Sequence, residues 1–299
     1  MTMPTNAGSH SIRIAIASGK GGTGKTLIAT SLFYSLQQHG LKVALIDCDA
    51  EEPNVMVFFQ GKPENTIDVT QGLPVIDEDQ CDYCGKCHEY CSYQAIFILP
   101  RLKVIRVMED LCHGCGACLA ACTKDAIREK EVSLGEITHY SVTKSSSVFE
   151  ARLRVGVYSP VPVIKAAVHG CGSHQIVLMD APPGTSCPFI HTVLTADYVI
   201  LVTEPTPFGL SDLKQSVETL RGMDKQFGVI VNRAGLGNNQ VYRYLEEEGI
   251  PLLLEVPFDK DMASIYSRGG VIAEHRPEFG EQLFQVVNRV NQNGGSSHN

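Results

Sequence analysis

The sequence predicts an α/β fold, a mostly parallel sheet flanked by helices, with a second, cysteine-rich domain inserted into it. Three observations predict this architecture. Short apolar runs alternate with segments of helical spacing, which is typical of buried parallel strands joined by crossover helices. A glycine-rich stretch follows the first apolar run. Eight of the eleven cysteines are confined to residues 81–122, where the alternation is interrupted.

The first elements are expected to form a β-α-β unit. Ile12–Ala17 is an apolar run ending in Ser-Gly, which indicates a buried strand that leads into a glycine loop. Thr26–Gln38 carries apolar residues at helical spacing and is followed by a glycine, a pattern that favours a helix. Val43–Ile46 predicts a second buried strand, which ends at Asp47-Cys48-Asp49.

The inserted domain is expected at residues 60–151, linkers included. Residues 60–80 are rich in Pro, Gly, Asp and Glu, and the cysteine block follows them. The two halves of this block match at a spacing of 31 residues, beyond the cysteines themselves, which indicates an internal duplication. Residues 132–155 predict short strands and a serine-rich connection, Ser145-Ser146-Ser147. The main domain then comprises residues 1–59 and 152–299.

The α/β alternation resumes after the insertion. The predicted strands are Ile176–Met179, Tyr198–Val202, Phe227–Val231 and Leu252–Leu254, and the predicted helices are Leu210–Leu220, Val241–Glu248 and Glu278–Val290. A polar tail, Asn291–Asn299, is expected to be disordered.

Composition excludes several classes of protein. The formal net charge is −8 and no basic run offsets it, which argues against nucleic-acid binding. No apolar stretch is long enough to span a bilayer, and Met1–His10 lacks the features of a signal peptide. The last helix carries a single basic residue on its body, Arg289, so no membrane anchor is expected. We therefore expect a cytoplasmic protein whose cysteines bind metal and do not form disulfides.

The glycine-rich stretch predicts a phosphate-binding loop. Gly19 to Thr26 satisfies G-x4-G-K-[ST] between a strand and a helix, a context that disfavours a fortuitous glycine turn. Backbone N–H groups and the helix N-terminus would hold the phosphates. Lys25 is expected to neutralise the β and γ oxygens, and the Thr26 hydroxyl to ligate Mg²⁺. The residues expected at the nucleotide are Gly19, Gly21, Gly22, Thr23, Gly24, Lys25, Thr26 and Leu27.

Lys20 adds a second lysine, so the loop reads Lys-Gly-Gly-Thr-Gly-Lys-Thr. In this it resembles the P-loop ATPases of the superfamily that includes MinD, ParA, Mrp and the nitrogenase iron protein. In that superfamily the extra lysine reaches across a dimer interface to the partner's nucleotide. The resemblance implies that Lys20 is catalytic together with Lys25, and that the chain is a homodimer with ATP between its subunits. A solvated surface lysine is the alternative.

Further segments match the same superfamily in order. Asp47-Cys48-Asp49 resembles its first switch, which implies that Asp49 positions the attacking water and binds Mg²⁺ with Thr26, and that Asp47 lies near the metal. Asp180 resembles the Walker B aspartate, and Pro182-Pro183-Gly184 the second switch, which senses the γ-phosphate. Asn232 matches the position that reads adenine, and Pro257-Phe258-Asp259 the loop that brackets the base.

The cysteine block predicts two [4Fe–4S] clusters. Its cysteines form two runs of C-x2-C-x2-C-x3-C, each with a glycine at the same position, Gly85 and Gly116. Zinc is the alternative, but zinc sites pair two knuckles and do not repeat a four-cysteine run. The block resembles a bacterial two-cluster ferredoxin, in which the fourth cysteine of each run serves the other cluster. The resemblance implies one cluster on Cys81, Cys84, Cys87 and Cys122, and another on Cys112, Cys115, Cys118 and Cys91.

The cysteine block departs from the ferredoxin pattern at two positions, and three cysteines of the chain lie outside the block. Ser92 and Thr123 follow the fourth cysteines where that family has proline, which alters the local turn but removes no ligand. Cys48 is expected to be a small packed residue. Cys187 lies just past the second switch and is a candidate for an extra metal site, because the nitrogenase iron protein holds a bridging cluster near its switches; packing is the alternative. Cys171 is expected at a helix end or as a partner of Cys187.

The whole chain resembles the MinD-superfamily ATPases that carry an inserted ferredoxin domain. Residues 203–210, Thr-Glu-Pro-Thr-Pro-Phe-Gly-Leu, carry this resemblance to the subgroup. It implies an ATPase whose dimer closure and switches are coupled to electron transfer through two clusters, with a redox protein or a cofactor-maturation protein as partner. The alternative is a carrier that delivers an iron–sulfur or other metal centre. A MinD-like positioning protein is disfavoured, because no basic amphipathic tail is present.

Overall fold

The computed structural model describes residues 11–294, and within it the chain divides into two compact units. Unit 1 comprises the chain up to Ile67, Ile137–Arg152 and the residues from Val161 onward; unit 2 comprises Asp68–Glu136 and Leu153–Pro160. The chain therefore enters unit 2 later than the expected position 60, and it returns to unit 1 earlier than residue 151.

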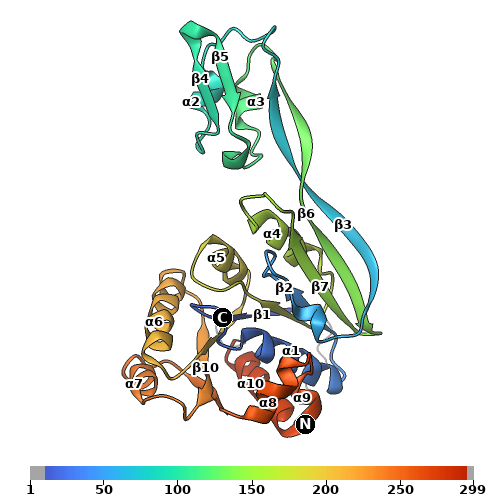
Figure 1. Ribbon diagram of the computed structural model, residues 1–299, viewed down its shortest axis with the longest axis vertical. Helices are drawn as coiled ribbons and strands as arrows, with labels where there is room; N and C mark the ends of the chain where they lie inside the picture. The colour runs from blue at the N-terminus through green and yellow to red at the C-terminus, as the bar shows by residue number, and fades with distance from the viewer. Residues whose placement is uncertain (1–10, 295–299) are drawn as a thin grey trace. The chain divides into compact units, whose positions relative to one another are not determined.

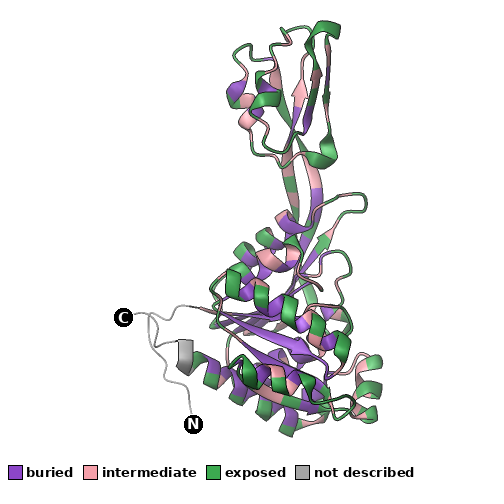
Figure 2. Ribbon diagram, turned by 90° about the vertical axis from the view of Figure 1, so that its left-hand side faces the viewer, coloured by how far each residue is buried: buried purple, intermediate pink, exposed green. Residues whose placement is uncertain are grey.

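Unit 1 is built on a sheet whose strand order is β11-β10-β9-β1-β8-β2-β7-β6-β3 (Figure 1). From β11 to β7, all neighbouring pairs are parallel. Figure 2 shows the central strands buried, as expected for parallel strands that are covered on both faces. The strands are β1 (Ile12–Ala17), β2 (Val43–Asp47), β3 (Lys62–Ile76), β6 (Ile127–Thr143), β7 (Ser146–Leu153), β8 (Ile176–Asp180), β9 (Tyr198–Thr203), β10 (Phe227–Ala234) and β11 (Leu252–Pro257).

Helices cover both faces of the sheet. One face packs on α1, α9 and α10 through a core that includes Leu32, Phe33 and Leu283, all fully buried. The alternate strand residues face the helices α4, α5 and α6. The helices are α1 (Lys25–Gln38), α4 (Val161–Gly170), α5 (Cys187–Leu194), α6 (Pro207–Gly222), α7 (Gln240–Glu247), α8 (Lys260–Ser267), α9 (Ile272–His275) and α10 (Pro277–Gly294). Within residues 11–294, no helix has the length and apolar character needed to cross a membrane.

The segments around the insertion differ from the prediction. Residues 62–76 form the long strand β3 and not a linker, and residues 127–143 form the long strand β6 and not short strands. Ser146 and Ser147 belong to β7 and not to a connection. Both long strands begin with exposed, mostly polar residues, 62–65 in β3 and 128–131 in β6, which hid them from a search for apolar runs. Strand β3 lies at the edge of the sheet and is hydrogen-bonded to β6. At the other end, α10 extends to Gly294, into the predicted tail; residues 295–299 and Met1–His10 lie outside the described residues.

Unit 2 holds the cysteine block on two short helices and a hairpin. The elements that lie entirely within it are α2 (Lys86–Glu89), α3 (Ala117–Ala121), the antiparallel pair β4 (Ile96–Leu99) and β5 (Val104–Val107), and two single-turn helices (Pro100–Leu102 and Glu109–Leu111). Its small core contains Ile96, Ile105 and two cysteines, Cys87 and Cys118. The duplication is visible in the backbone, because residues with positive φ recur 31 positions apart: Tyr83 and Gly114, Gly85 and Gly116, Gln94 and Asp125.

Candidate functional site

The phosphate-binding loop lies at the centre of the sheet of unit 1. It leaves the carboxyl end of β1, between β8 and β9, which is where open parallel sheets bind ligands. The loop ends at Gly24, whose φ of 98° disfavours a side chain. A Cβ on Gly24 would also lie 2.3 Å from Nδ2 of Asn232. Glycine is therefore required here by the backbone and by the neighbour.

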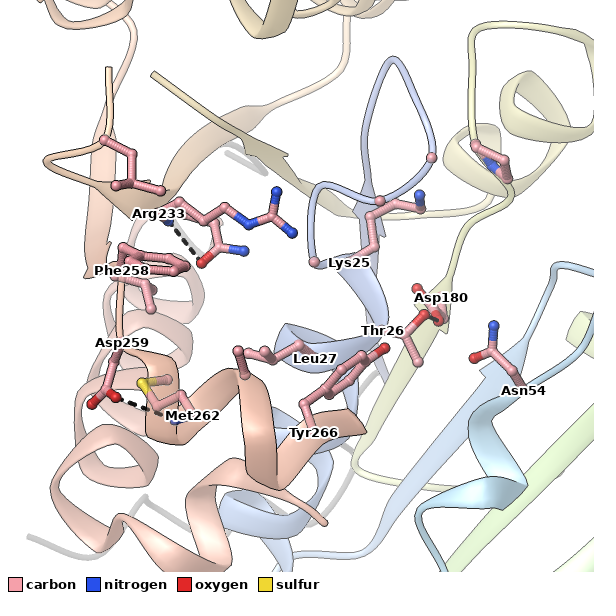
Figure 3. A pocket seen from close by; sticks show the side chains of 18 of the residues that line it. Lys25, Thr26, Leu27, Asn54, Asp180, Arg233, Phe258, Asp259, Met262 and Tyr266 are labelled. Atoms are coloured by element: carbon pink, nitrogen blue, oxygen red, sulfur yellow. Dashed lines mark hydrogen bonds between the residues drawn. The ribbon is translucent and has the colours of Figure 1, made fainter. Parts of the chain in front are cut away.

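A cavity of about 490 Å³ opens beside this loop (Figure 3). Of the predicted site residues, it is lined by Gly21, Gly22, Gly24, Lys25, Thr26, Leu27, Asp49, Asp180, Asn232, Pro257 and Phe258. Gly19, Lys20 and Thr23 lie instead along a crevice between the loop, β9 and α6 that has no room for a ligand. Asp47 and Gly184 line neither the cavity nor the crevice.

Lys25 is folded into the protein. Its side chain is buried, and Nζ donates to Oγ of Ser18 at 3.0 Å. Burial lowers the pKa of Lys25, while the nearby carboxylates of Asp180 and Asp49 oppose that shift. A lysine in such a position is held close to where phosphate oxygens would enter the loop.

Asp180 and Thr26 form a hydrogen-bonded pair that leaves one carboxylate oxygen available to bind a cation. The Thr26 hydroxyl donates to Oδ2 of Asp180 at 2.6 Å, whereas Oδ1 of Asp180 is buried without a hydrogen-bond partner. Burial raises the pKa of Asp180 to about 6. Burial also raises the pKa of Asp49, which lines the same cavity. These hydroxyl and carboxylate oxygens are the donors that Mg²⁺ prefers, so the residues fit that ion.

Asp47 holds the first switch and the segment after it through hydrogen bonds to the backbone. Its carboxylate is buried and accepts backbone N–H bonds from Asp49, Asn54 and Val55 at 3.2, 2.8 and 2.9 Å. Burial, with Asp180 nearby, raises the pKa of Asp47 to about 8. Asp47 therefore holds the loop that presents Asp49 and lies near Asp180, but it does not line the cavity itself.

Lys20 is paired within its own chain. Its Nζ lies 3.6 Å from Oε2 of Glu204, at the end of β9, and a third of its side chain is exposed. The same glutamate, almost buried, binds Arg233 at 2.5 Å through Oε1. Glu204 thus forms ion pairs with two positively charged side chains, and the pair with Lys20 is the longer.

The far side of the cavity contains residues that the sequence did not indicate. Arg233, Leu236 and Val256 come from β10 and β11 and the segment after β10, and Met262, Ala263 and Tyr266 come from α8. Asn54 and Ala181 also line the cavity, as do Asp259 and Pro183 from the predicted base-bracketing loop and second switch. Asn232 itself donates from Nδ2 to the backbone oxygen of Thr23 at 2.8 Å, so in this structure its amide holds the loop. Arg233 follows a predicted site residue, but no pattern marked α8.

The cysteines of unit 2 gather around two cavities. One is lined by Cys81, Cys84, Cys87 and Cys122, and the other by Cys91, Cys112, Cys115 and Cys118. Backbone N–H groups point at the sulfurs: Tyr83 donates to Cys81 at 3.4 Å, Gly114 to Cys112 at 3.5 Å and Ala95 to Cys91 at 3.2 Å. Each cavity therefore takes three cysteines from one run and the fourth from the other.

These sulfurs are not arranged around a single ion. Within the described part of the chain, no group of three or more His, Cys, Asp or Glu side chains is positioned to hold one metal ion. Zinc on four thiolates requires Zn–S distances of about 2.3 Å, and hence sulfurs in close contact. Each four-cysteine cavity has a volume of about 20 Å³, and none of the eleven cysteines forms a disulfide.

The remaining cysteines lie in unit 1. Cys187 is exposed at the first position of α5, and Cys48 is fully buried at the end of β2. Cys171 is buried, and its thiol donates to the backbone oxygen of Val168 at 3.3 Å. It therefore lies at the end of α4, as a helix-end residue.

The fold and the loop together define a P-loop nucleotide-binding protein with a mostly parallel sheet. The profile of the CbiA family, the CobQ/CobB/MinD/ParA nucleotide binding domain, matches residues 14–272. The chain belongs to this family.

Similar proteins agree with this assignment. The uncharacterized protein MJ0578 of Methanocaldococcus jannaschii is 27% identical over 283 residues, which cover 94% of this chain and 97% of that protein. The iron-sulfur cluster carrier protein of Aquifex aeolicus is 23% identical over 283 residues, or 89% of this chain and 62% of that protein. The septum site-determining protein MinD of Pyrococcus horikoshii, solved with Mg-ADP, has a TM-score of 0.57 at 19% identity, covering 96% and 98% of the two chains. This structural likeness concerns the fold.

Proposed function

We propose that this protein is an ATPase that couples nucleotide-driven changes at its switches to electron transfer through two [4Fe–4S] clusters in unit 2. The observation that carries the proposal is the pair of cavities that each bring together four cysteines from both runs. The sulfur-directed N–H groups support it, because such donors stabilise thiolates that hold a cluster. When bound, such clusters carry single electrons.

The nucleotide chemistry follows from unit 1. The loop from Gly19 to Thr26 would hold the phosphates of ATP, with Lys25 against the β and γ oxygens. Thr26 and Asp49 would hold Mg²⁺, with Asp180 as the acceptor that orients the Thr26 hydroxyl. Asp49 would also orient the attacking water, which cleaves ATP to ADP and phosphate. Lys20 would leave Glu204 to reach a partner subunit's nucleotide in a homodimer.

The order of the chain supports this coupling. The first switch, Asp47–Asp49, is followed in the chain by β3, which begins at Lys62, 13 residues after Asp49, and carries the chain into unit 2. A change of the first switch with the γ-phosphate would act on this segment. A redox protein would supply or accept the electrons, in the cytoplasm.

The test is to purify the protein anaerobically, count iron and sulfide, and record EPR spectra with and without Mg·ATP. About eight irons per chain are expected, in two clusters. Cys122→Ala and Cys91→Ala should each disturb one cluster and leave the other, whereas Cys187→Ala should leave the iron content unchanged. About two zinc ions per chain, without sulfide, would refute the cluster proposal.

A second candidate is a carrier that delivers an iron–sulfur or other metal centre. The similarity to the iron-sulfur cluster carrier protein favours it. A carrier would lose iron to an apo-protein acceptor in an ATP-dependent manner, and iron beyond about eight per chain would point to a labile site near Cys187. The electron-transfer proposal instead expects stable clusters whose reduction potential or oxidation rate changes with nucleotide.

A further inference from the structure

The hairpin β4–β5 in unit 2 has an outer face on which apolar and basic side chains lie together (Figure 1). Side chains alternate between the two faces of a strand, and Ile96 and Ile105 belong to the core of unit 2. Their neighbours Phe97 and Arg106 lie directly opposite each other in the strand register and are exposed. With the turn, this face forms a patch, the hairpin surface, which consists of Phe97, Leu99, Arg101, Leu102, Lys103 and Arg106. Its three apolar members are 40% to 70% exposed, so it offers apolar area to a partner.

The hairpin surface is also positively charged. From position 90 to position 108 the chain has no Asp or Glu, although its formal net charge is −8. The three cations of the hairpin surface make no ion pair within residues 11–294, whereas Lys124 and Lys130 of the same unit pair with Asp82 and Glu109. A molecule that brings negative charge to this face would therefore be attracted to it.

The inner face of the same hairpin lines both cysteine cavities. Ile98 and Ile105 lie along the cavity of Cys81, Cys84, Cys87 and Cys122. Ile96 lies along the cavity of Cys91, Cys112, Cys115 and Cys118. A molecule bound to the hairpin surface is therefore separated from both cavities only by the hairpin itself.

We propose that the hairpin surface binds an acidic one-electron carrier protein, such as one that holds a flavin. Apolar contact would be made at Phe97 and Leu102, and carboxylates of the carrier would surround the three cations. One electron would cross the hairpin in each encounter, from this protein to the carrier or back, with no bond made or broken. An anionic membrane would also attract apolar and basic side chains, but lipids carry no electrons, so the position beside both cavities favours the protein. This inference rests on the proposed electron-transfer function.

The first test measures how a purified, strongly acidic flavodoxin binds to the full-length, cluster-loaded protein, by calorimetry over a range of salt concentrations. Binding to wild type should weaken as salt rises, because salt screens exposed charges. The double variant Arg101→Glu/Arg106→Glu should raise the dissociation constant at low salt about ten- to hundredfold, because two attractions become two repulsions. Arg128→Glu/Arg154→Glu is the matched control, since it makes the same change of charge at two exposed residues of unit 2 outside the hairpin. It should raise the constant by less than about threefold.

The second test maps the contact by hydrogen exchange, with and without the flavodoxin. Residues 97–106 of wild type should gain protection, and this gain should be lost in Arg101→Glu/Arg106→Glu and kept in the control. Vesicles of phosphatidylserine and phosphatidylcholine, added in place of the flavodoxin, should leave the exchange of these residues unchanged.

Four results would overturn the inference alone: wild type that does not bind the flavodoxin, an equal loss of affinity in the two double variants, protection outside the hairpin only, or protection of residues 97–106 by the vesicles. Anaerobic purification of a protein without iron and sulfide would instead overturn the proposed function, and the inference with it.

Discussion

The contact between Lys20 and Glu204 predicts how readily the proposed dimer forms. Glu204→Gln keeps the shape of the side chain but removes the charge that holds Lys20 at 3.6 Å. Arg233 then loses its partner too, at little cost, since about half of its side chain is exposed. Lys20 would therefore be free to reach a partner's nucleotide without first breaking an ion pair in its own chain.

The expected size follows from the exposure of Lys20. With a third of that side chain exposed, each pair is worth about 0.2–1 kcal/mol. A symmetric dimer breaks two such pairs, so Glu204→Gln should favour dimerisation by about 0.4–2 kcal/mol, a factor of roughly 2–30 in the dimer dissociation constant.

The assay is analytical ultracentrifugation over a range of protein concentrations, with Mg·ATP and a hydrolysis-blocking analogue of ATP. Glu248→Gln is the control, because it also removes one ion pair, a more exposed one with Arg221, and neither residue lines the cavity or the crevice beside the loop. An unchanged dissociation constant in Glu204→Gln, or an equal shift in Glu248→Gln, would refute the idea that Glu204 withholds Lys20.

Three further predictions concern the loop, a histidine and a cap. Gly24→Ala should abolish nucleotide binding measured by calorimetry and cost about 1–3 kcal/mol of stability, because φ is 98° and the added Cβ would clash with Asn232. Gly222→Ala is the control and should have neither effect, because a Cβ there has no neighbour within 4 Å. Burial, aided by the nearby positive charges of His139 and Lys42, lowers the pKa of His174. The unfolded state therefore binds more protons, and the free energy of unfolding should fall as pH falls through 6.5. Urea midpoints should show this fall in wild type and less of it in His174→Gln. Thr206→Ala, which removes the cap of α6 at the N–H of Gly209, should cost about 1 kcal/mol in the same urea assay.

The central fold was predictable because parallel strands buried on both faces are continuous apolar runs. Ile12–Ala17 has the predicted bounds, and five other strands were located but were predicted to end too early: β2 by one residue, and four strands after the insertion. Each of these four extends into polar or proline residues, such as Asp180, Thr203 and Pro257, at the carboxyl end of the sheet. Of these, Asp180 and Pro257 line the large cavity, so apolar patterning fails where the site begins.

The partners of the site residues were not predictable, because they lie far apart in sequence. Glu204 is separated from Lys20 by most of the chain, and Tyr266 lies on a short helix whose polar and apolar residues gave no sign of a site. The long strand β3 was also missed, because its first residues, 62–65, are mostly polar and exposed and resemble a linker.

The duplication in unit 2 illustrates what a repeat preserves and what it leaves to vary. Positions 82 and 124 form an ion pair, Asp82–Lys124 at 3.7 Å, beside one cysteine cavity. The positions 31 residues from these, 113 and 93, are occupied by His113 and Tyr93, whose rings stack at 3.9 Å beside the other cavity. The backbone keeps its positive φ angles and its N–H groups toward sulfur, because every copy of the loop must wrap four cysteines. The side-chain contact beside the cavity differs between the two copies: it is an ion pair in one and an aromatic stack in the other, although equivalent positions are in contact in both. Equivalent loops therefore surround their cysteines with unequal electrostatics, a difference that the cysteine spacing alone does not predict.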